Sequence, residues 1–98
     1  EQARAIIMSQ YANDISLHSV ARQIGVNPSY LSRVFKQETG ENFTHFLTRV
    51  RMEKAKHYLK EKRLKVYEVA NQVGYQNTTY FSKIFKKVTG ITPEEFRG

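Results

Sequence analysis

The chain has no cysteine and no long apolar run, and each absence excludes a class of protein. Without Cys, neither a disulfide scaffold nor a thiolate metal site can form. No apolar run approaches the roughly 18 residues of a membrane span, and no signal-peptide pattern opens the chain. Because hydrophobic residues make up 40% and aromatics 12%, a disordered basic tail is also excluded. We expect a soluble, cytoplasmic domain without membrane contact.

Signals for catalysis and for metal or cofactor binding are also missing. The three histidines, His18, His45 and His57, have no ligand spacing and no nearby carboxylate pair. The sequence contains no glycine-rich phosphate loop, no nucleophile elbow and no paired-acid arrangement. We therefore expect a protein that is not an enzyme and that binds no metal or cofactor.

Acidic residues are few, and their scarcity sets the charge. Against 9 Asp and Glu stand 16 Lys and Arg, which gives the chain a net charge of +7 and a pI of about 9.8. A chain of 98 residues is one typical domain or two very small lobes. The missing initiator Met and the helical start suggest a piece of a longer protein. The charge predicts a polyanionic partner.

The sequence contains an internal repeat. Residues 20–25 (VARQIG) match residues 69–74 (VANQVG) at an offset of 49, and residues 30–36 (YLSRVFK) match residues 80–86 (YFSKIFK) at an offset of 50. The second copy therefore has one extra residue, which lies between the two matched stretches. Two copies are too few for a solenoid, so a duplicated supersecondary unit is the better interpretation.

Each copy is typical of a helix, a short turn and a second helix. In the first copy, Gly25 ends the first helix, Asn27 caps the second and Pro28 opens it. A small residue in the middle of the first helix, Ala21, allows the second helix to cross closely, which is the helix-turn-helix signature. The apolar stripes predicted to be buried are Leu17, Val20, Ala21 and Ile24, then Leu31, Val34 and Phe35.

The second copy repeats this pattern, with Asn77 as the cap of its second helix and Lys65 where a good first cap would stand. Further helices are predicted at residues 2–11, over the long charged segment between the copies, and after a capping box at Thr92. The sequence thus predicts an all-α fold of seven helices. Two helix-turn-helix subdomains, at residues 1–42 and 64–98, are joined by a long central linker helix at residues 43–63, which is a rod of roughly 30 Å.

The second helix of each copy presents hydroxyls and cations on one outward stripe. These outward positions are Ser29, Ser32, Arg33 and Lys36, and Thr79, Ser82, Lys83 and Lys86. No acid stands among them, and such a helix fits the major groove of B-DNA, where Arg holds guanine bidentately. A single charged face is usually only solvated surface, but two equivalent faces in a basic chain favour DNA binding. Phosphate contacts are expected from Asn27, Lys36, Asn77, Lys86 and Lys87.

The basic run after the first copy and the two tyrosines each allow more than one interpretation. The basic run over residues 49–65 fits phosphate contact as well as solubility and local ion pairs. Tyr30 and Tyr80 begin their helices, and packing between the helices is favoured over base stacking. Arg51, among the apolar positions of the central helix, is expected to have a structural role that ties carboxylates or helix ends together.

The chain resembles the C-terminal DNA-binding domain of the AraC/XylS family of bacterial transcription regulators over essentially its whole length. The resemblance is carried by residues 17–21, 29–36, 39–40, 51–55, 69–70 and 73–75, and most specifically by the run from Gly74 to Arg97 with Gly90 and Pro93. It implies two homeodomain-like lobes whose recognition helices enter successive major grooves. It also implies control of transcription, usually activation, through contact with RNA polymerase.

The resemblance also implies which residues read bases. By position these are Ser29, Tyr30, Ser32 and Arg33 in the first copy, and Thr78, Thr79, Ser82 and Lys83 in the second. The isolated domain is expected to bind double-stranded DNA as a monomer, and the parent protein as a dimer. Two alternatives stay open at this point: a non-specific nucleic-acid binder and a helical protein-interaction module.

Overall fold

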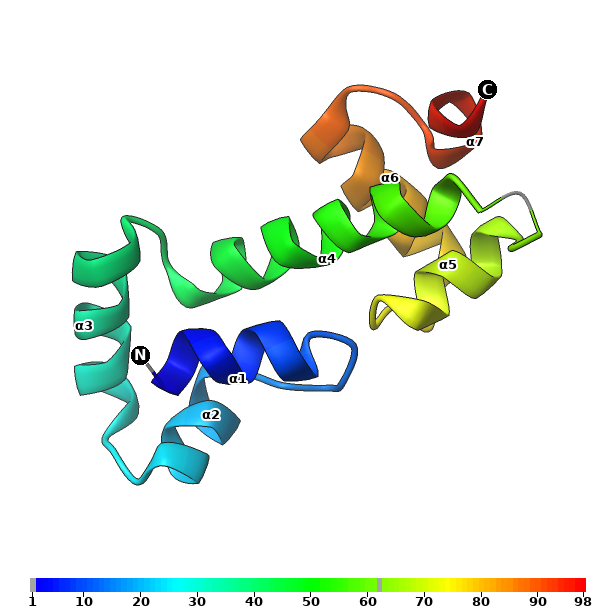
Figure 1. Ribbon diagram of the computed structural model, residues 1–98. Coiled ribbons are helices and arrows are strands. Elements are labelled where there is room, and N and C mark those ends of the chain that lie inside the picture. Colours follow the sequence, from blue (N-terminus) through cyan, green and yellow to red (C-terminus); the bar gives the residue numbers. More distant parts are fainter. Residues whose placement is uncertain (1, 62) are drawn as a thin grey trace. The chain divides into compact units, whose positions relative to one another are not determined.

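The computed structural model describes residues 2–61 and 63–98, and over these residues the protein is entirely helical (Figure 1). The all-α prediction with seven helices is confirmed for this part of the chain. None of these helices is both long and apolar enough to cross a membrane. The helices are α1 (Gln2–Gln10), α2 (Leu17–Ile24), α3 (Pro28–Thr39), α4 (Phe43–Leu59), α5 (Val66–Gln72), α6 (Thr78–Thr89) and α7 (Pro93–Arg97).

The chain divides into two compact units, Glu1–Val50 and Arg51–Gly98. The boundary falls within α4, so the first half of that helix belongs to the first unit and the second half to the second unit. The segment expected at residues 43–63 is therefore shared between the units and does not form a unit of its own.

The core of the first unit is built around Phe35 of α3. This side chain is fully buried, and its ring packs against Phe43 at 5.7 Å and edge-on against Phe46 at 5.2 Å between ring centroids. Edge-to-face pairs at these distances add stabilisation beyond the area they bury. The other buried residues of this core are Ala3, Ile7, Val20, Ala21, Leu31, Leu47 and Val50.

The core of the second unit repeats this arrangement around Phe85 of α6. Phe85 is fully buried, and its ring packs against Phe81 at 5.9 Å and against Phe96 of α7 at 5.7 Å. The second half of α4 contributes Met52, Ala55 and Leu59, which are also buried. The first unit thus buries one face of α3 and the second unit one face of α6, and the opposite face of each helix is left to solvent.

The central helix is shorter than the sequence predicts: it ends at Leu59, four residues before the expected residue 63. The Leu59 carbonyl accepts a hydrogen bond of 3.0 Å from the Arg97 guanidinium, and the Glu61 N–H donates to the Tyr58 carbonyl, three residues back, in a turn. The end of the helix is thus satisfied by a side chain 38 residues away, and the chain turns.

Candidate nucleic-acid interface

The corner between α2 and α3 is built by local capping contacts. Gly25 adopts the left-handed conformation (φ 89°), and its N–H donates to the Ala21 carbonyl at 2.8 Å. Asn27 Oδ1 accepts the Ser29 N–H at 2.8 Å, so that α3 begins at Pro28. Ala21 is completely buried at this corner, as the sequence predicts.

The corner between α5 and α6 shares part of this hydrogen bonding and has one extra residue. The Tyr75 N–H donates to the Ala70 carbonyl at 2.8 Å, just as the Val26 N–H donates to the Ala21 carbonyl at 2.9 Å. Tyr75 therefore stands in the place of Val26, and the extra residue is the exposed Gln76. The insertion lengthens the turn, and α5 also ends differently from α2: the Gly74 N–H donates to the Asn71 carbonyl, three residues back, whereas the Gly25 N–H donates to the Ala21 carbonyl, four residues back.

The outward face of α3 carries every contact residue that the sequence predicts there. Leu31 and Phe35 point into the core, which leaves the other side of the helix to solvent. The exposed residues on that side are Ser29, Tyr30, Ser32, Arg33 and Lys36.

The corresponding face of α6 is more cationic and offers fewer free hydroxyls. The helix has no acidic residue at all. The predicted residues Thr79, Lys83, Lys86 and Lys87 are exposed, as is Tyr80, whereas Thr78 and Ser82 are half-buried.

Both predicted asparagines serve as helix caps. The side-chain oxygen of Asn27 is taken up by the first N–H groups of α3, and Asn77 Oδ1 accepts the Tyr80 N–H at 2.9 Å. Because an amide has a separate NH₂ donor, a phosphate contact by either residue would come from its nitrogen.

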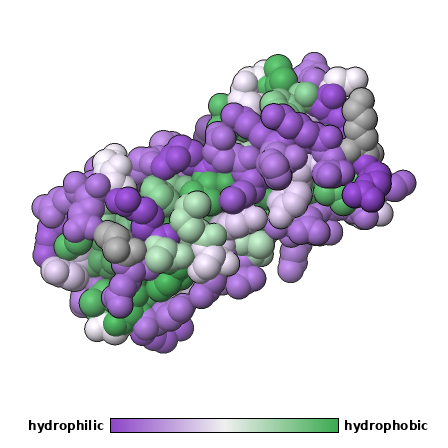
Figure 2. Space-filling model, viewed as in Figure 1, coloured by the Kyte–Doolittle hydropathy of each residue, from purple (hydrophilic) through white to green (hydrophobic). Residues whose placement is uncertain are grey.

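Positive charge is divided very unevenly between the two units. Residues 51–98 contain eleven Lys and Arg against five Glu, a net charge of +6, whereas residues 1–50 contain five basic and four acidic residues, a net charge of +1. Figure 2 shows hydrophilic side chains over most of one face, with apolar residues visible among α1–α3. The net positive charge, which attracts a polyanion at long range, therefore lies mainly in the second unit.

The tyrosines at the start of α3 and α6 have different partners. Tyr30 lies under Arg33 of the same helix, with the guanidinium carbon 5.5 Å from the ring centroid. Tyr80 packs instead against the ring of Tyr75 at 5.9 Å. Arg51 of α4 lies over Tyr75 at 5.1 Å, so the structural role expected for Arg51 includes a ring contact.

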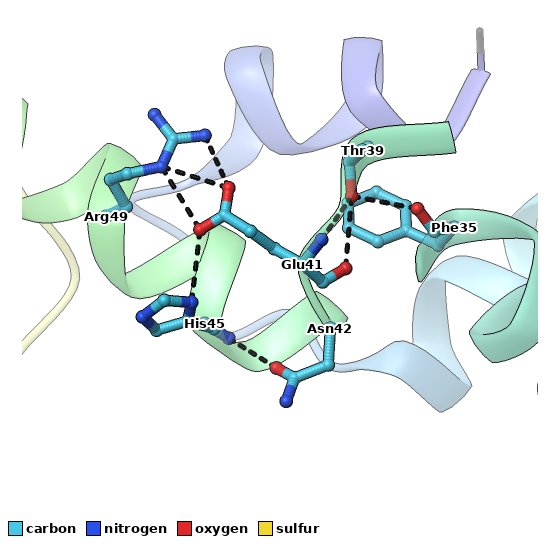
Figure 3. Close-up of polar contacts among 6 residues, drawn as sticks. All are labelled: Phe35, Thr39, Glu41, Asn42, His45 and Arg49. Carbon is cyan, nitrogen blue, oxygen red and sulfur yellow. Dashed lines mark hydrogen bonds and ion pairs between the residues drawn. The ribbon is translucent and has the colours of Figure 1, made fainter. Parts of the chain in front are cut away.

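Glu41, in the turn between α3 and α4, organises a polar cluster that the sequence analysis does not identify (Figure 3). Its carboxylate accepts Arg49 Nη2 at 2.8 Å and lies 3.1 Å from His45 Nδ1. The hydrogen bond from Arg49, helped by the charges of Arg49 and His45, lowers the pKa of the Glu41 carboxyl against the opposing effect of burial. The cluster ties α4 to the end of α3. Among the described residues, no three His, Asp or Glu are grouped to hold a metal ion.

Comparison with known proteins decides the family. A family model described as a helix-turn-helix domain matches residues 20–98. Over 85 residues, the chain is 35% identical to the arabinose operon regulatory protein of Escherichia coli, covering 87% of this chain and 29% of that protein. The chain belongs to the AraC/XylS family. It is a DNA-binding domain of the type found in these transcription regulators, and the prediction of family, fold and general function is confirmed.

Two further likenesses place this AraC/XylS domain among longer regulators. The C-terminal domain of AraT, a response regulator from Geobacillus stearothermophilus, is 45% identical with a TM-score of 0.94, covering 97% of this chain and 79% of that one. An uncharacterized transcriptional regulatory protein of Bacillus subtilis, YesN, is 51% identical over 74 residues, which are 74% of this chain and 20% of that protein. The chain thus spans 29% of the length of the arabinose operon regulatory protein and 20% of the length of YesN.

Proposed function

We propose that this AraC/XylS domain binds duplex DNA sequence-specifically, with α3 and α6 as recognition helices in successive major grooves. Its biological role in this proposal is to regulate bacterial transcription in the cytoplasm, chiefly as an activator that contacts RNA polymerase. The observation that carries the proposal is the duplication: each helix-turn-helix corner is followed by an exposed helix face that carries cations. The isolated domain binds as a monomer, and the parent protein as a dimer.

In this proposal, α3 reads bases. Arg33 is exposed and carries a planar guanidinium, which suits the two acceptors that guanine presents in the major groove. Ser29 and Ser32 are exposed on the same face and offer hydroxyls that can meet base edges or phosphates. The N-terminus of α3, which is 12 residues long, adds a partial positive charge near the backbone.

The role of α6 is weighted toward the phosphate backbone. Lys83, Lys86 and Lys87 are exposed and bind phosphate as flexible point charges, without the fixed geometry of Arg. Thr79 adds one exposed hydroxyl at the start of the helix, beside the half-buried Thr78 and Ser82.

A titration with duplex DNA tests this function. Affinity should fall on the order of 10²-fold between about 50 and 200 mM salt if about four phosphates are neutralised. One protein should bind per site, and unrelated duplexes, single strands and RNA should compete weakly. Equal affinity for all nucleic acids would favour a non-specific binder, and the absence of salt-dependent binding would favour a protein-interaction module. Either result contradicts the proposal.

A further inference from the structure

Tyr30 and Tyr80 occupy equivalent positions in the first turns of α3 and α6, but their rings have different partners. The ring of Tyr30 is half-exposed and lies under the Arg33 guanidinium at 5.5 Å. The ring of Tyr80 is equally exposed, yet it packs against Tyr75 at 5.9 Å. The two helices therefore present their central cation, Arg33 or Lys83, from different surroundings.

The turn before each helix accounts for the difference. The second unit has Tyr75 where the first unit has Val26, and Tyr75 is nearly buried between Phe81, at 5.7 Å, and the Tyr80 ring. A valine has no ring for a tyrosine to pack against. In the first unit, Tyr30 lines a shallow apolar hollow together with Val26, and its ring also carries Arg33.

The position of Arg33 over Tyr30 bears on recognition. Side chains on a helix lean toward its N-terminus, so a guanidinium that reaches three residues back lies over the first turn of α3. This is the end of a recognition helix whose residues meet base edges in the major groove. An arginine loses considerable rotamer freedom when it binds a base, and a ring beneath the guanidinium removes part of that freedom beforehand.

We propose that Tyr30 is a positioning residue: its ring holds the Arg33 guanidinium ready for a guanine and makes the first unit the main reader of sequence. This inference rests on the proposed function of α3 as a recognition helix. The second unit, in which Lys83 follows a tyrosine that packs on Tyr75, supplies mostly sequence-independent attraction through its net charge of +6.

The test compares variants of Tyr30 on duplexes that differ at one base pair. That base pair is the one at which Arg33→Ala removes the preference of the unmodified domain. Tyr30→Leu should lower the preference at the same base pair by about two- to five-fold, the size of an exposed cation–π contact. Tyr30→Phe keeps a ring and should retain the preference. Tyr80→Leu, the matched control in the second unit, should leave it unchanged.

Affinity for random-sequence duplex separates positioning from general damage, because it should stay within about two-fold for Tyr30→Leu if only Arg33 is affected. A second readout needs no DNA: the NMR signal of the Arg33 Nε–H should lose its ring-current shift in Tyr30→Leu and keep it in Tyr30→Phe.

Several results would overturn the inference. In the binding test, these are an unchanged preference in Tyr30→Leu, a loss at a different base pair, or an equal loss in Tyr30→Phe. In the NMR test, it is an Arg33 Nε–H shift that is the same in Tyr30→Leu as in the unmodified domain. If the unmodified domain itself prefers no sequence, the result refutes the proposed function and not only the role of Tyr30. If the ring-current shift is present in that case, the contact exists but serves no readout.

Discussion

The first and second units repeat one backbone arrangement and differ in what they attach to it. Thr39 Oγ1 donates to the Phe35 carbonyl at 2.8 Å, and Thr89 Oγ1 donates to the Phe85 carbonyl at the same distance. Two residues further on, however, the first unit has Glu41, with its ion pairs, where the second has an exposed apolar Ile91.

This difference shows how a duplicated unit can diverge in function. The hydrogen bonds of each corner are made locally, so the exposed positions change without altering the fold. In the first unit, with a net charge of +1, α3 has an arginine against a tyrosine ring, whereas in the second unit, with +6, α6 has lysines and no arginine. In the proposed function, one unit therefore reads DNA sequence and the other holds the DNA backbone.

The largest expected effect tests whether the two cores are equivalent. Phe35→Ala and Phe85→Ala each remove a completely buried ring and should each lower the free energy of unfolding by about 3–5 kcal/mol. Urea denaturation followed by circular dichroism measures both. Tyr67→Ala, at an exposed site on α5, is the control. A loss below about 1 kcal/mol in only one unit would show that its core is not packed as described.

The next largest effect distinguishes base recognition by α3 from phosphate binding by α6. Arg33→Ala should cost about 1–3 kcal/mol of discrimination at one base pair, because it removes a bidentate contact. Lys83→Ala should weaken all sequences more evenly. Competition binding against single-base variants of the preferred duplex measures both. The division of roles would be wrong if Lys83→Ala caused the larger loss of discrimination.

A smaller effect concerns the salt dependence of binding. Replacing Lys86 and Lys87 with Ala should reduce the slope of log affinity against log salt by about 0.9 for each phosphate contact removed. Lys60→Ala removes one positive charge just after α4 and serves as the control. If Lys60→Ala lowered the slope as much per charge removed, diffuse charge would explain the result, and α6 would have no special role.

The smallest effect belongs to the polar cluster of the first unit. The lowered pKa of Glu41 means that its contribution to stability is present above the ordinary carboxyl pKa and is lost as the pH falls through the lowered value. Glu41→Gln should therefore lower the free energy of unfolding at pH 7 by less than about 1 kcal/mol, because the ion pairs are partly solvated.

The measurement is urea denaturation of Glu41→Gln and the unmodified domain across the acid range. The difference between them should shrink to nothing well below the ordinary carboxyl pKa. Glu53→Gln, in an exposed ion pair on α4, is the control. A difference that grew as the pH fell would contradict the direction of the shift.

The sequence predicts most of the fold because its signals are short-range. The cap of Asn27 on Ser29 and the capping box of Thr92 with Glu95 involve residues no more than three apart. The contacts that escape prediction join distant residues. Arg97 reaches the Leu59 carbonyl across 38 residues, which no periodicity reveals, and the end of α4 was misplaced for that reason.

The site was predictable in its positions and not in its chemistry. The helical period places Arg33 and Lys83 on outward faces, and both are exposed. That Tyr30 lies under Arg33 while Tyr80 packs against Tyr75 depends on the ring of Tyr75, which stands where the first unit has Val26, and helical spacing does not show which rings meet.

The central claim is that the two recognition helices contribute unequally to sequence preference. Selection of bound duplexes from a random pool tests it most directly. We expect two patches of preferred sequence about 10–10.5 base pairs apart, one strong and one weak. Repeating the selection with Arg33→Ala should abolish the strong patch, whereas Lys83→Ala should leave it in place. A strong patch that survives Arg33→Ala and disappears in Lys83→Ala would contradict the account.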